Sequence, residues 1–240
     1  MHFRILHKDE WLVAIEKPAG FQVHPPENPA HSLSRNKNCL FLLRKQLEEK
    51  LYPVHRLDSA TSGVLLFALT PEIARNLQSA FQAQEIQKRY YAVVRGFTPD
   101  EGTIDHPLSD LDAREDDETA LPAKPSLTQY ETLFRTEKEV AVGRYATSRY
   151  SLVRVEPKTG RQHQIRRHFA HISHPLIGDT VYGDGKHNRH FRTVLETRAL
   201  LLKAYSLRLT HPVTSESLFL RCRWGDTWQR VFNFFGACPF

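Results

Sequence analysis

One short stretch combines a carboxylate, a guanidinium and two hydroxyl groups at a spacing that could support catalysis. Within His55–Gly63, Asp58 lies two residues after Arg56 and just before Thr61 and Ser62. An ionised Asp held on a rigid loop can act as a nucleophile or a base. The same residues also fit a structural turn in which Arg56 pairs with Asp58, because ion pairs organise turns as well as active sites.

The elements on either side of this stretch would hold it in place. The apolar run Val64–Leu69 follows at once and predicts a buried strand. Before it, Leu40, Leu43 and Leu47 recur at helical spacing and predict a helix. After it, Thr70-Pro71 predicts the start of another helix, with a hydroxyl N-cap and proline in the first turn.

A second stretch, Pro157–Phe169, concentrates positive charge at a predicted turn and helix start. Ile165 and Phe169 share one face of that helix, and Arg166 lies next to this face and could reach inward. We expect Arg161, Arg167 and His168 to lie outside. Cations at a helix start oppose the helix dipole, so an anionic ligand would explain them better than stability does. A solvated charged face remains the alternative.

Composition indicates an intracellular protein with a polyanionic partner. The 240 residues carry 33 Lys and Arg against 27 Asp and Glu, a net charge of +6. Such an excess favours nucleic acid as the partner. The three cysteines are odd in number and lack metal-ligand spacing, which predicts free thiols in the cytoplasm. No apolar stretch has the length of a signal core or a membrane span, so no membrane partner is expected.

The rest of the chain predicts a mixed α+β fold around a largely antiparallel central sheet flanked by helices. No repeat or clear linker divides it, so we expect one catalytic domain over 1–240 with a mobile excursion near 98–126. Strands are expected near residues 3–7, 11–15, 88–96, 129–134, 150–155, 200–209 and 218–223, and further helices near 189–195 and from Asp226.

Four stretches in order resemble the motifs of the RluA-type pseudouridine synthase family. The Asp58 stretch is similar to the catalytic motif, and Lys88–Tyr90 to the family's lysine-x-tyrosine strand. The opening motif, the third motif and its sequel are matched by Glu16–His24, Thr159–Arg166 and His174–Asp179. The resemblance covers nearly the whole chain and implies the pseudouridine synthase catalytic fold. Because a first strand is expected from Phe3, the S4-type domain of some relatives is expected to be absent.

The resemblance also implies roles for individual residues. Asp58 would be the essential aspartate, Arg166 its ion-pair partner, and Tyr90 would lie against the target base. Arg56 would occupy the space that the flipped uridine leaves. His55, Arg149, Arg161 and Arg167 would contact RNA, although the three arginines fit a solvated face equally well.

The implied reaction breaks the C1′–N1 bond of a uridine, turns the base and joins C1′ to C5. Neither redox chemistry nor energy input is involved, so no cofactor, metal or obligate protein partner is expected. Within the family the chain most resembles the members that act on uridine 65 of transfer RNA, through Gly143–Tyr145 with Thr147, through Arg149-Tyr150 and through the doubled Arg166-Arg167, so uridine 65 of transfer RNA is the expected substrate. Ribosomal RNA is the alternative substrate. A non-catalytic RNA-binding protein is disfavoured, because a carboxylate such as Asp58 within a basic site would repel phosphate. A glycosidase is disfavoured as well, because it needs two cooperating carboxylates and Asp58 is alone in its motif.

Overall fold

The computed structural model describes residues 2–24, 34–109 and 122–238. Contacts divide the chain into two compact units, Met1–Arg89 with Lys203–Arg223, and Tyr90–Leu202 with Trp224–Phe240. The chain passes from one unit to the other after Arg89, after Leu202 and after Arg223. Two strands, β5 (Gln87–Arg95) and β9 (Leu202–Thr210), run across these boundaries.

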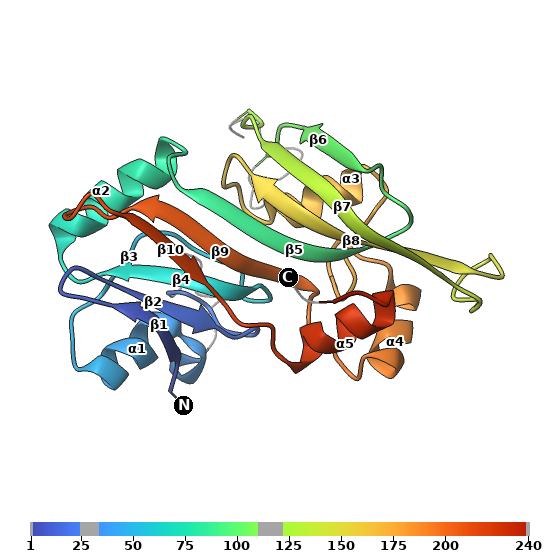
Figure 1. The fold of residues 1–240 in the computed structure, drawn as a ribbon, viewed down its shortest axis with the longest axis horizontal. Coiled ribbons are helices and arrows are strands. Elements are labelled where there is room, and N and C mark those ends of the chain that lie inside the picture. Colours follow the sequence, from blue (N-terminus) through green and yellow to red (C-terminus); the bar gives the residue numbers. More distant parts are fainter. Residues whose placement is uncertain (1, 25–33, 110–121, 239–240) are drawn as a thin grey trace. The chain divides into compact units, whose positions relative to one another are not determined.

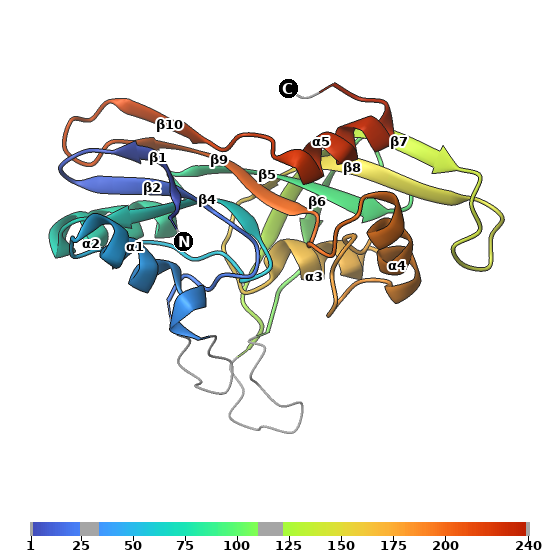
Figure 2. The ribbon, with the colours of Figure 1, turned by 90° about the horizontal axis from the view of Figure 1, so that it is seen from below.

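The first unit is built on strands in the order β1-β2-β4-β9, with β10 on β9 and β3 on β4 (Figure 1). The pairs are antiparallel except β4 and β9, which meet in parallel at Ser62 and Gly63. Two helices, α1 and α2, lie on the same side of β1, β2 and β4 (Figure 2). The elements are β1 (Arg4–Lys8), β2 (Leu12–Lys17), a 3-10 helix (Arg35–Lys37), α1 (Cys39–Leu47), β3 (Tyr52–Pro53), β4 (Ser62–Ala68), α2 (Pro71–Gln82) and β10 (Ser217–Arg221).

The core of this unit follows from its apolar runs. Residues 12–15 of β2 and 64–68 of β4 are fully buried, so both strands are covered on both faces. The helices begin where the sequence supplies caps: the side chains of Asn38 and Thr70 accept the N–H groups of Phe41 and Ile73. These two buried strands form the rigid base from which the Asp58 stretch leaves the sheet.

The second unit carries a fully antiparallel sheet in the order β5-β8-β7-β6. Helix α3 packs on one face of β7 and β8, and α5 on the other (Figure 2). The long β7–β8 hairpin ends in the basic and aromatic connection that contains Arg144 and Tyr145. The elements are β6 (Glu101–Asp105), β7 (Leu127–Lys138), β8 (Ser148–Pro157), α3 (Gln164–His171), α4 (Gly185–Val194) and α5 (Asp226–Phe235).

The predicted α+β class and the largely antiparallel sheet are confirmed. The strand β6 was missed: it lies inside 98–126, where only a polar excursion was expected, and pairs with β7 along five residue pairs. Leu108 and Lys124 form a further bridge beyond it. The middle of that excursion, 110–121, lies outside the described residues, as does most of the polar loop before α1. Among the described residues, no helix has the length and apolar character of a membrane span.

Candidate active site

Asp58 lies on the loop that connects β3 to β4 in the first unit. Its side chain is half-buried, whereas that of Arg56 is exposed. The carbonyl of Asp58 accepts the N–H of Thr61 at 3.0 Å, which closes a turn directly over the start of β4. Thr61 itself is only 2% exposed. The loop therefore holds one carboxylate at a fixed point while a neighbouring guanidinium stays accessible to a ligand.

Lys17, at the end of β2, anchors this loop to the sheet. Its side chain is fully buried at the end of β2, and its ammonium donates to the carbonyls of Pro18 at 3.1 Å, Phe21 at 2.8 Å and Ser59 at 3.1 Å. The carbonyl of Ser59 also accepts the N–H of Gly20 at 2.7 Å. Ser59, the residue after Asp58, is thus bonded twice to the turn 17–21, so this turn holds the Asp58 loop in place.

The charge of Lys17 responds to its surroundings. Burial lowers the pKa of Lys17 to about 8, against which negative charge at Cys39 and Asp58 would raise it. Burial also raises the pKa of the Cys39 thiol to about 11, so Cys39 is neutral at pH 7. Asp58 is therefore the charge that favours the protonated form of Lys17 at neutral pH.

We expect Lys17→Met to destabilise the protein by about 3 kcal/mol, because it removes a buried charged donor from three backbone carbonyls. Urea unfolding at pH 7 measures the difference. Lys45→Met on α1 is the matched control, since Lys45 is exposed and its loss should cost less than about 0.5 kcal/mol. Equal midpoints for the two variants would contradict the anchoring role.

His55 attaches the other end of the loop to β4. Its Nε2 accepts the backbone N–H of Leu66 at 3.0 Å, so the ring proton is on Nδ1, and the ring stacks on Phe81 at 4.6 Å. Burial lowers the pKa of His55 to about 3, helped by the charge of Lys88. A neutral His55 ring with one nitrogen bonded to β4 is suited to positioning the Asp58 loop. The predicted contact of His55 with RNA remains a prediction.

Gly63 is required where the loop enters β4. Its φ is +134°, and a Cβ at this position would lie 2.1 Å from the carbonyl oxygen of Ala204 on β9. The parallel contact between β4 and β9 therefore depends on glycine at this position. This explains in physical terms why the Asp58 stretch ends in Ser62-Gly63.

The second predicted stretch is organised by Gln164, a residue to which sequence reasoning gave no role. Its buried amide donates to the carbonyl of Leu127 and the hydroxyl of Thr128, both at 3.0 Å. Its oxygen accepts from the hydroxyl of Thr159 at 2.7 Å and the N–H of Arg161 at 2.9 Å. One side chain thus fixes the turn before α3 against β7.

Arg166 reaches inward from α3, as predicted, and is 5% exposed. Its Nε donates to Oδ2 of Asp179 at 2.7 Å and its Nη2 to Oδ1 at 2.9 Å. The carboxylate of Asp179 also accepts the N–H groups of Val181 and Tyr182. Burial raises the pKa of Asp179, but these donors outweigh it and hold that pKa below its usual range. Because a guanidinium has five donors, this pair is compatible with a second carboxylate on Arg166.

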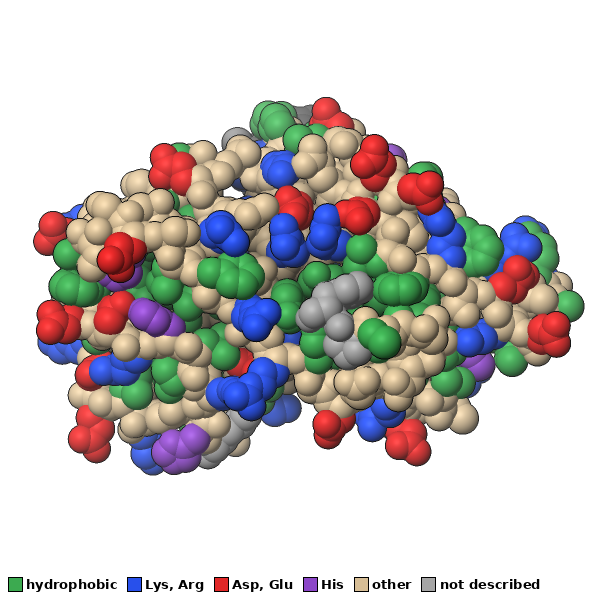
Figure 3. Space-filling view, viewed as in Figure 1, with side chains coloured by type: hydrophobic (Ala, Val, Ile, Leu, Met, Phe, Trp, Pro, Cys, Tyr) green, Lys and Arg blue, Asp and Glu red, His purple; other side chains and the backbone are tan. Residues whose placement is uncertain are grey.

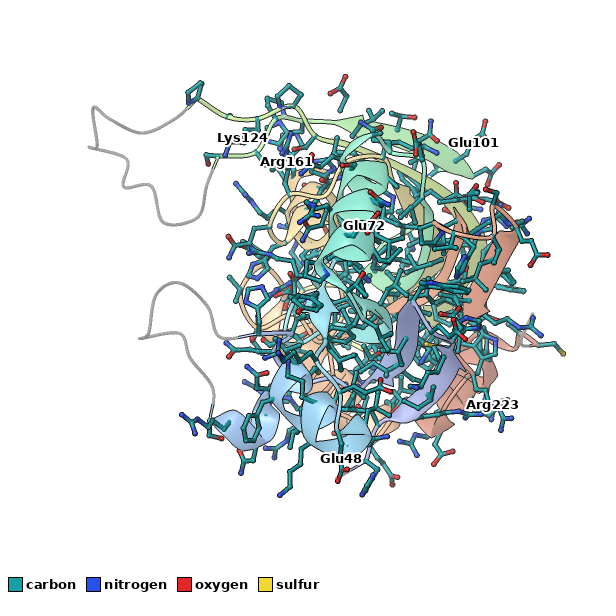
Figure 4. The ribbon with its side chains drawn as sticks, turned by 90° about the vertical axis from the view of Figure 1, so that its left-hand side faces the viewer. Glu48, Glu72, Glu101, Lys124, Arg161 and Arg223 are labelled. Carbon is teal, nitrogen blue, oxygen red and sulfur yellow. The ribbon has the colours of Figure 1, made fainter. Side chains whose placement is uncertain are left out.

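The three predicted RNA-binding arginines lie at two places in the second unit. Arg167 donates to the carbonyl of Ser109 at 2.8 Å, and Arg161 to that of Pro125 at 3.3 Å. Figure 4 shows Arg161 beside Lys124. Arg149 lies instead on β8, where it pairs with Glu137 and covers the ring of Phe97.

The prediction that His168 lies outside was wrong, because its ring is fully buried. Its Nε2 lies 3.0 Å from the carbonyl of His106, next to β6. The strand β6 was absent from the predicted fold, so nothing in the sequence pattern indicated a cover for this side of α3.

Tyr90 lies at the start of the second unit, paired with Val155 in register, and is half-buried.

Comparison with known proteins decides the family. A family model described as RNA pseudouridylate synthase matches residues 11–171, more than half of the chain. The chain belongs to the RNA pseudouridylate synthase family. The matched residues include Asp58, Tyr90 and Arg166, and the resemblance to this family in the motifs is confirmed.

Relatives within the family cover nearly the whole chain. The tRNA pseudouridine synthase C of Yersinia pestis is 44% identical over 97% of this chain and 90% of its own. That of Vibrio parahaemolyticus is 40% identical over 98% and 96%. The relative of the same name from Pectobacterium carotovorum is 44% identical over 97% of this chain, which spans 62% of that longer protein.

Solved structures of synthases support the fold. The human RNA pseudouridylate synthase domain containing 4 has a TM-score of 0.73 and 27% identity over 97% of this chain and 93% of its own. The human domain containing 1 has a TM-score of 0.70 over 99% and 96%, and at 21% identity it supports the fold alone.

Proposed function

We propose that this protein converts a uridine of transfer RNA, at position 65, to pseudouridine, with Asp58 as the catalytic carboxylate. The observation that carries the proposal is the fixed position of Asp58: Lys17 and His55 hold its loop from both ends, and exposed Arg56 lies beside it. The relatives named tRNA pseudouridine synthase C supply the RNA class. The two units would act together as one catalytic domain over 1–240, in the cytoplasm.

The chemistry needs little beyond positioned side chains. The target uridine must leave its stack before C1′ can be reached, at a cost of a few kcal/mol. Arg56 would fill the vacated space and Tyr90 would stack on the base. Asp58 would attack the sugar or the base, or remove the 2′ proton, and the turned base would rejoin C1′ through C5 with loss of the C5 proton. On the family resemblance, Arg166 balances the charge of Asp58.

Arg149, Arg161 and Arg167 would contribute phosphate contacts. Arg161 and Arg167 support this role because their exposed guanidinium groups are held by the backbone carbonyls of Pro125 and Ser109. Binding should weaken steeply as salt concentration rises, by a slope that grows with the number of phosphate contacts.

The substrate is tested with transcripts labelled with tritium at C5 of uridine. We expect tritium release from transfer RNA, abolished when uridine 65 is replaced by cytidine. Release from ribosomal RNA alone would reassign the substrate while keeping the reaction. Free uracil in place of pseudouridine would indicate a hydrolase, and binding with no release a non-catalytic RNA-binding protein.

The role of Tyr90 is tested by Tyr90→Phe and Tyr90→Ala. Loss of the ring in Tyr90→Ala should reduce turnover strongly, because base–aromatic stacking contributes about 1–3 kcal/mol. Tyr90→Phe keeps the ring, yet we expect it to be impaired, since the phenol is our candidate for accepting the C5 proton. Turnover rates of the two variants separate the roles. Full activity of Tyr90→Phe would leave only stacking.

A further inference from the structure

A small pocket lies in the first unit on residues that the catalytic motifs do not use. Its volume is about 160 Å³, and it is lined by Gln87 and Arg89 of β5, Ser206 and Arg208 of β9, and Phe219 of β10. We call it the Arg208 pocket. Basic side chains and apolar groups lie together over β9 and β10 on this face of the molecule (Figure 3).

Strand alternation separates the Arg208 pocket from the catalytic loop. The ring of His55, on the Asp58 loop, stacks on Phe81 of α2, and the charge of Lys88 lies close enough to that ring to lower its pKa, which places the side chain of Lys88 on the face of the sheet that α2 covers. Neighbouring residues of a strand point to opposite faces, which places Gln87 and Arg89 on the other face. A ligand in the pocket would therefore contact a surface opposite to the catalytic loop of this unit.

The register of β9 and β10 gathers further cationic and aromatic groups on that face. Arg208 is paired with Phe219, and Ser206 with Arg221, so the side chains of each pair share one face. The guanidinium of Arg208 lies 5.1 Å from the centre of the Phe219 ring. Phe219 remains 45% exposed, although large apolar side chains gain free energy from burial.

The lining has the chemistry of a nucleotide site. Arg89 and Arg208 line the same small pocket, and none of the five lining residues carries a carboxylate. Two guanidinium groups match the oxygens of a phosphate, which they bind through paired N–H donors. The ring of Phe219 offers a surface on which a base can stack, and Gln87 and Ser206 add polar groups.

We propose that the Arg208 pocket binds one unpaired nucleotide of the RNA substrate, with its phosphate at Arg89 and Arg208 and its base on Phe219. This proposal rests on the proposed function, because it assumes that RNA is the substrate. The pocket is smaller than the ~300–1,000 Å³ typical of small-molecule sites, so it accommodates a phosphate and part of one nucleoside. It is a second RNA contact that increases affinity without taking part in the reaction.

The test compares two tritium-labelled transcripts, a full-length transfer RNA and a short stem-loop that carries only the target arm. Arg208→Ala should raise KM for the full-length transcript about tenfold, with a much smaller effect on kcat. It should also lower the salt slope of binding by about 1, because one phosphate contact is lost. The stem-loop, too short to reach the opposite face, should be turned over with an unchanged KM.

Two further variants separate the contributions of charge and ring. Phe219→Ala should raise KM for the full-length transcript, and Phe219→Trp should keep it near the wild-type value because the stacking surface remains. Arg75→Ala is the control for loss of a positive charge, since Arg75 is an exposed residue of α2 in the same unit. Thermal melting checks folding, and Arg208→Gln replaces Arg208→Ala if the latter melts early.

The outcomes distinguish this inference from the proposed function. If wild-type protein releases no tritium from transfer RNA, the proposed function fails. If it releases tritium and Arg208→Ala behaves like Arg75→Ala on the full-length transcript, the pocket has no role in RNA binding. Equal KM increases on both transcripts would also overturn the inference, because the effect would then arise near the catalytic loop. Binding of free uridine monophosphate to wild type and to Arg208→Ala is measured directly. Binding that Arg208→Ala abolishes, with the KM for transfer RNA unchanged, would assign the pocket to free nucleotides instead.

Discussion

Asp58→Asn is expected to release no tritium from labelled transfer RNA above background while still binding that RNA. The amide has nearly the same size as the carboxylate, and the turn closed by Thr61 and the anchor at Lys17 use backbone carbonyls, so the substitution removes none of their hydrogen-bond acceptors. It lacks the negative charge that a nucleophile or base needs. Binding should be equal or slightly tighter, because a carboxylate that repels phosphate is removed. Release of tritium and the binding affinity are measured on the same preparation.

A matched control shows that the loss is specific to this position. Asp105→Asn removes an exposed carboxylate from β6 and should keep wild-type turnover. Substantial turnover by Asp58→Asn would contradict the proposed catalytic role of Asp58. A variant that neither turns over nor binds RNA, and melts early, would instead show that the carboxylate holds the loop, which is the structural role open from the sequence.

The parts of the fold that the sequence predicted are those with strong local signals. The buried strands β2 and β4 are continuous apolar runs, and α2 begins at a hydroxyl cap followed by proline. By contrast, β6 has the sequence Glu-Gly-Thr-Ile-Asp, in which only Ile104 is buried. The strand forms because it pairs with β7, although most of its residues have low β-propensity and it has no apolar alternation. Pairing with a strand distant in the sequence leaves no local pattern by which it could be predicted.

The candidate site divides in the same way. The motif around Asp58 was visible because acid, base and hydroxyl residues are adjacent in sequence. The supporting groups were not: Lys17 lies 42 residues from the Ser59 carbonyl that it binds, and Gln164 lies 37 from Leu127. Charged and amide side chains are mostly exposed, so a sequence pattern alone assigns them to the surface. Only the fold shows that both are buried and bonded.

The partner of Arg166 shows the same limit. The sequence placed Asp179 in a turn and gave it no function, yet it holds Arg166 through two hydrogen bonds in the buried interior of the second unit. Bidentate pairs of this kind fix the plane of the guanidinium. Asp179 is therefore a positioning residue for Arg166, and the direction in which the remaining donors of Arg166 point depends on it.

Arg166→Met is accordingly expected to destabilise the protein by about 3–5 kcal/mol at pH 7.5, since it leaves the carboxylate of Asp179 buried without its cation. Met keeps much of the length and apolar volume of the Arg side chain, so the loss in free energy of unfolding measures the contribution of the guanidinium charge. Urea unfolding measures it, with Arg154→Met as the control, because the pair of Arg154 with Glu131 is partly exposed to solvent and should contribute less than about 1 kcal/mol. Turnover should also be lost if Arg166 balances Asp58.

The dependence of this destabilisation on pH tests its cause. In the wild type the folded pKa of Asp179 is lowered, so its contribution to stability is present above the unfolded pKa and is lost as pH falls through the folded pKa. In Arg166→Met, burial should raise that pKa above the unfolded value, so the variant gains stability as pH falls and Asp179 takes up a proton. The difference between wild type and variant should therefore shrink at pH 4.5. Adding Asp179→Asn to Arg166→Met should recover part of the lost stability at pH 7.5, because no buried charge then remains. A difference that is the same at both pH values, together with strictly additive effects of the two substitutions, would show that packing of the Arg166 side chain, and not its charge, stabilises this part of the fold.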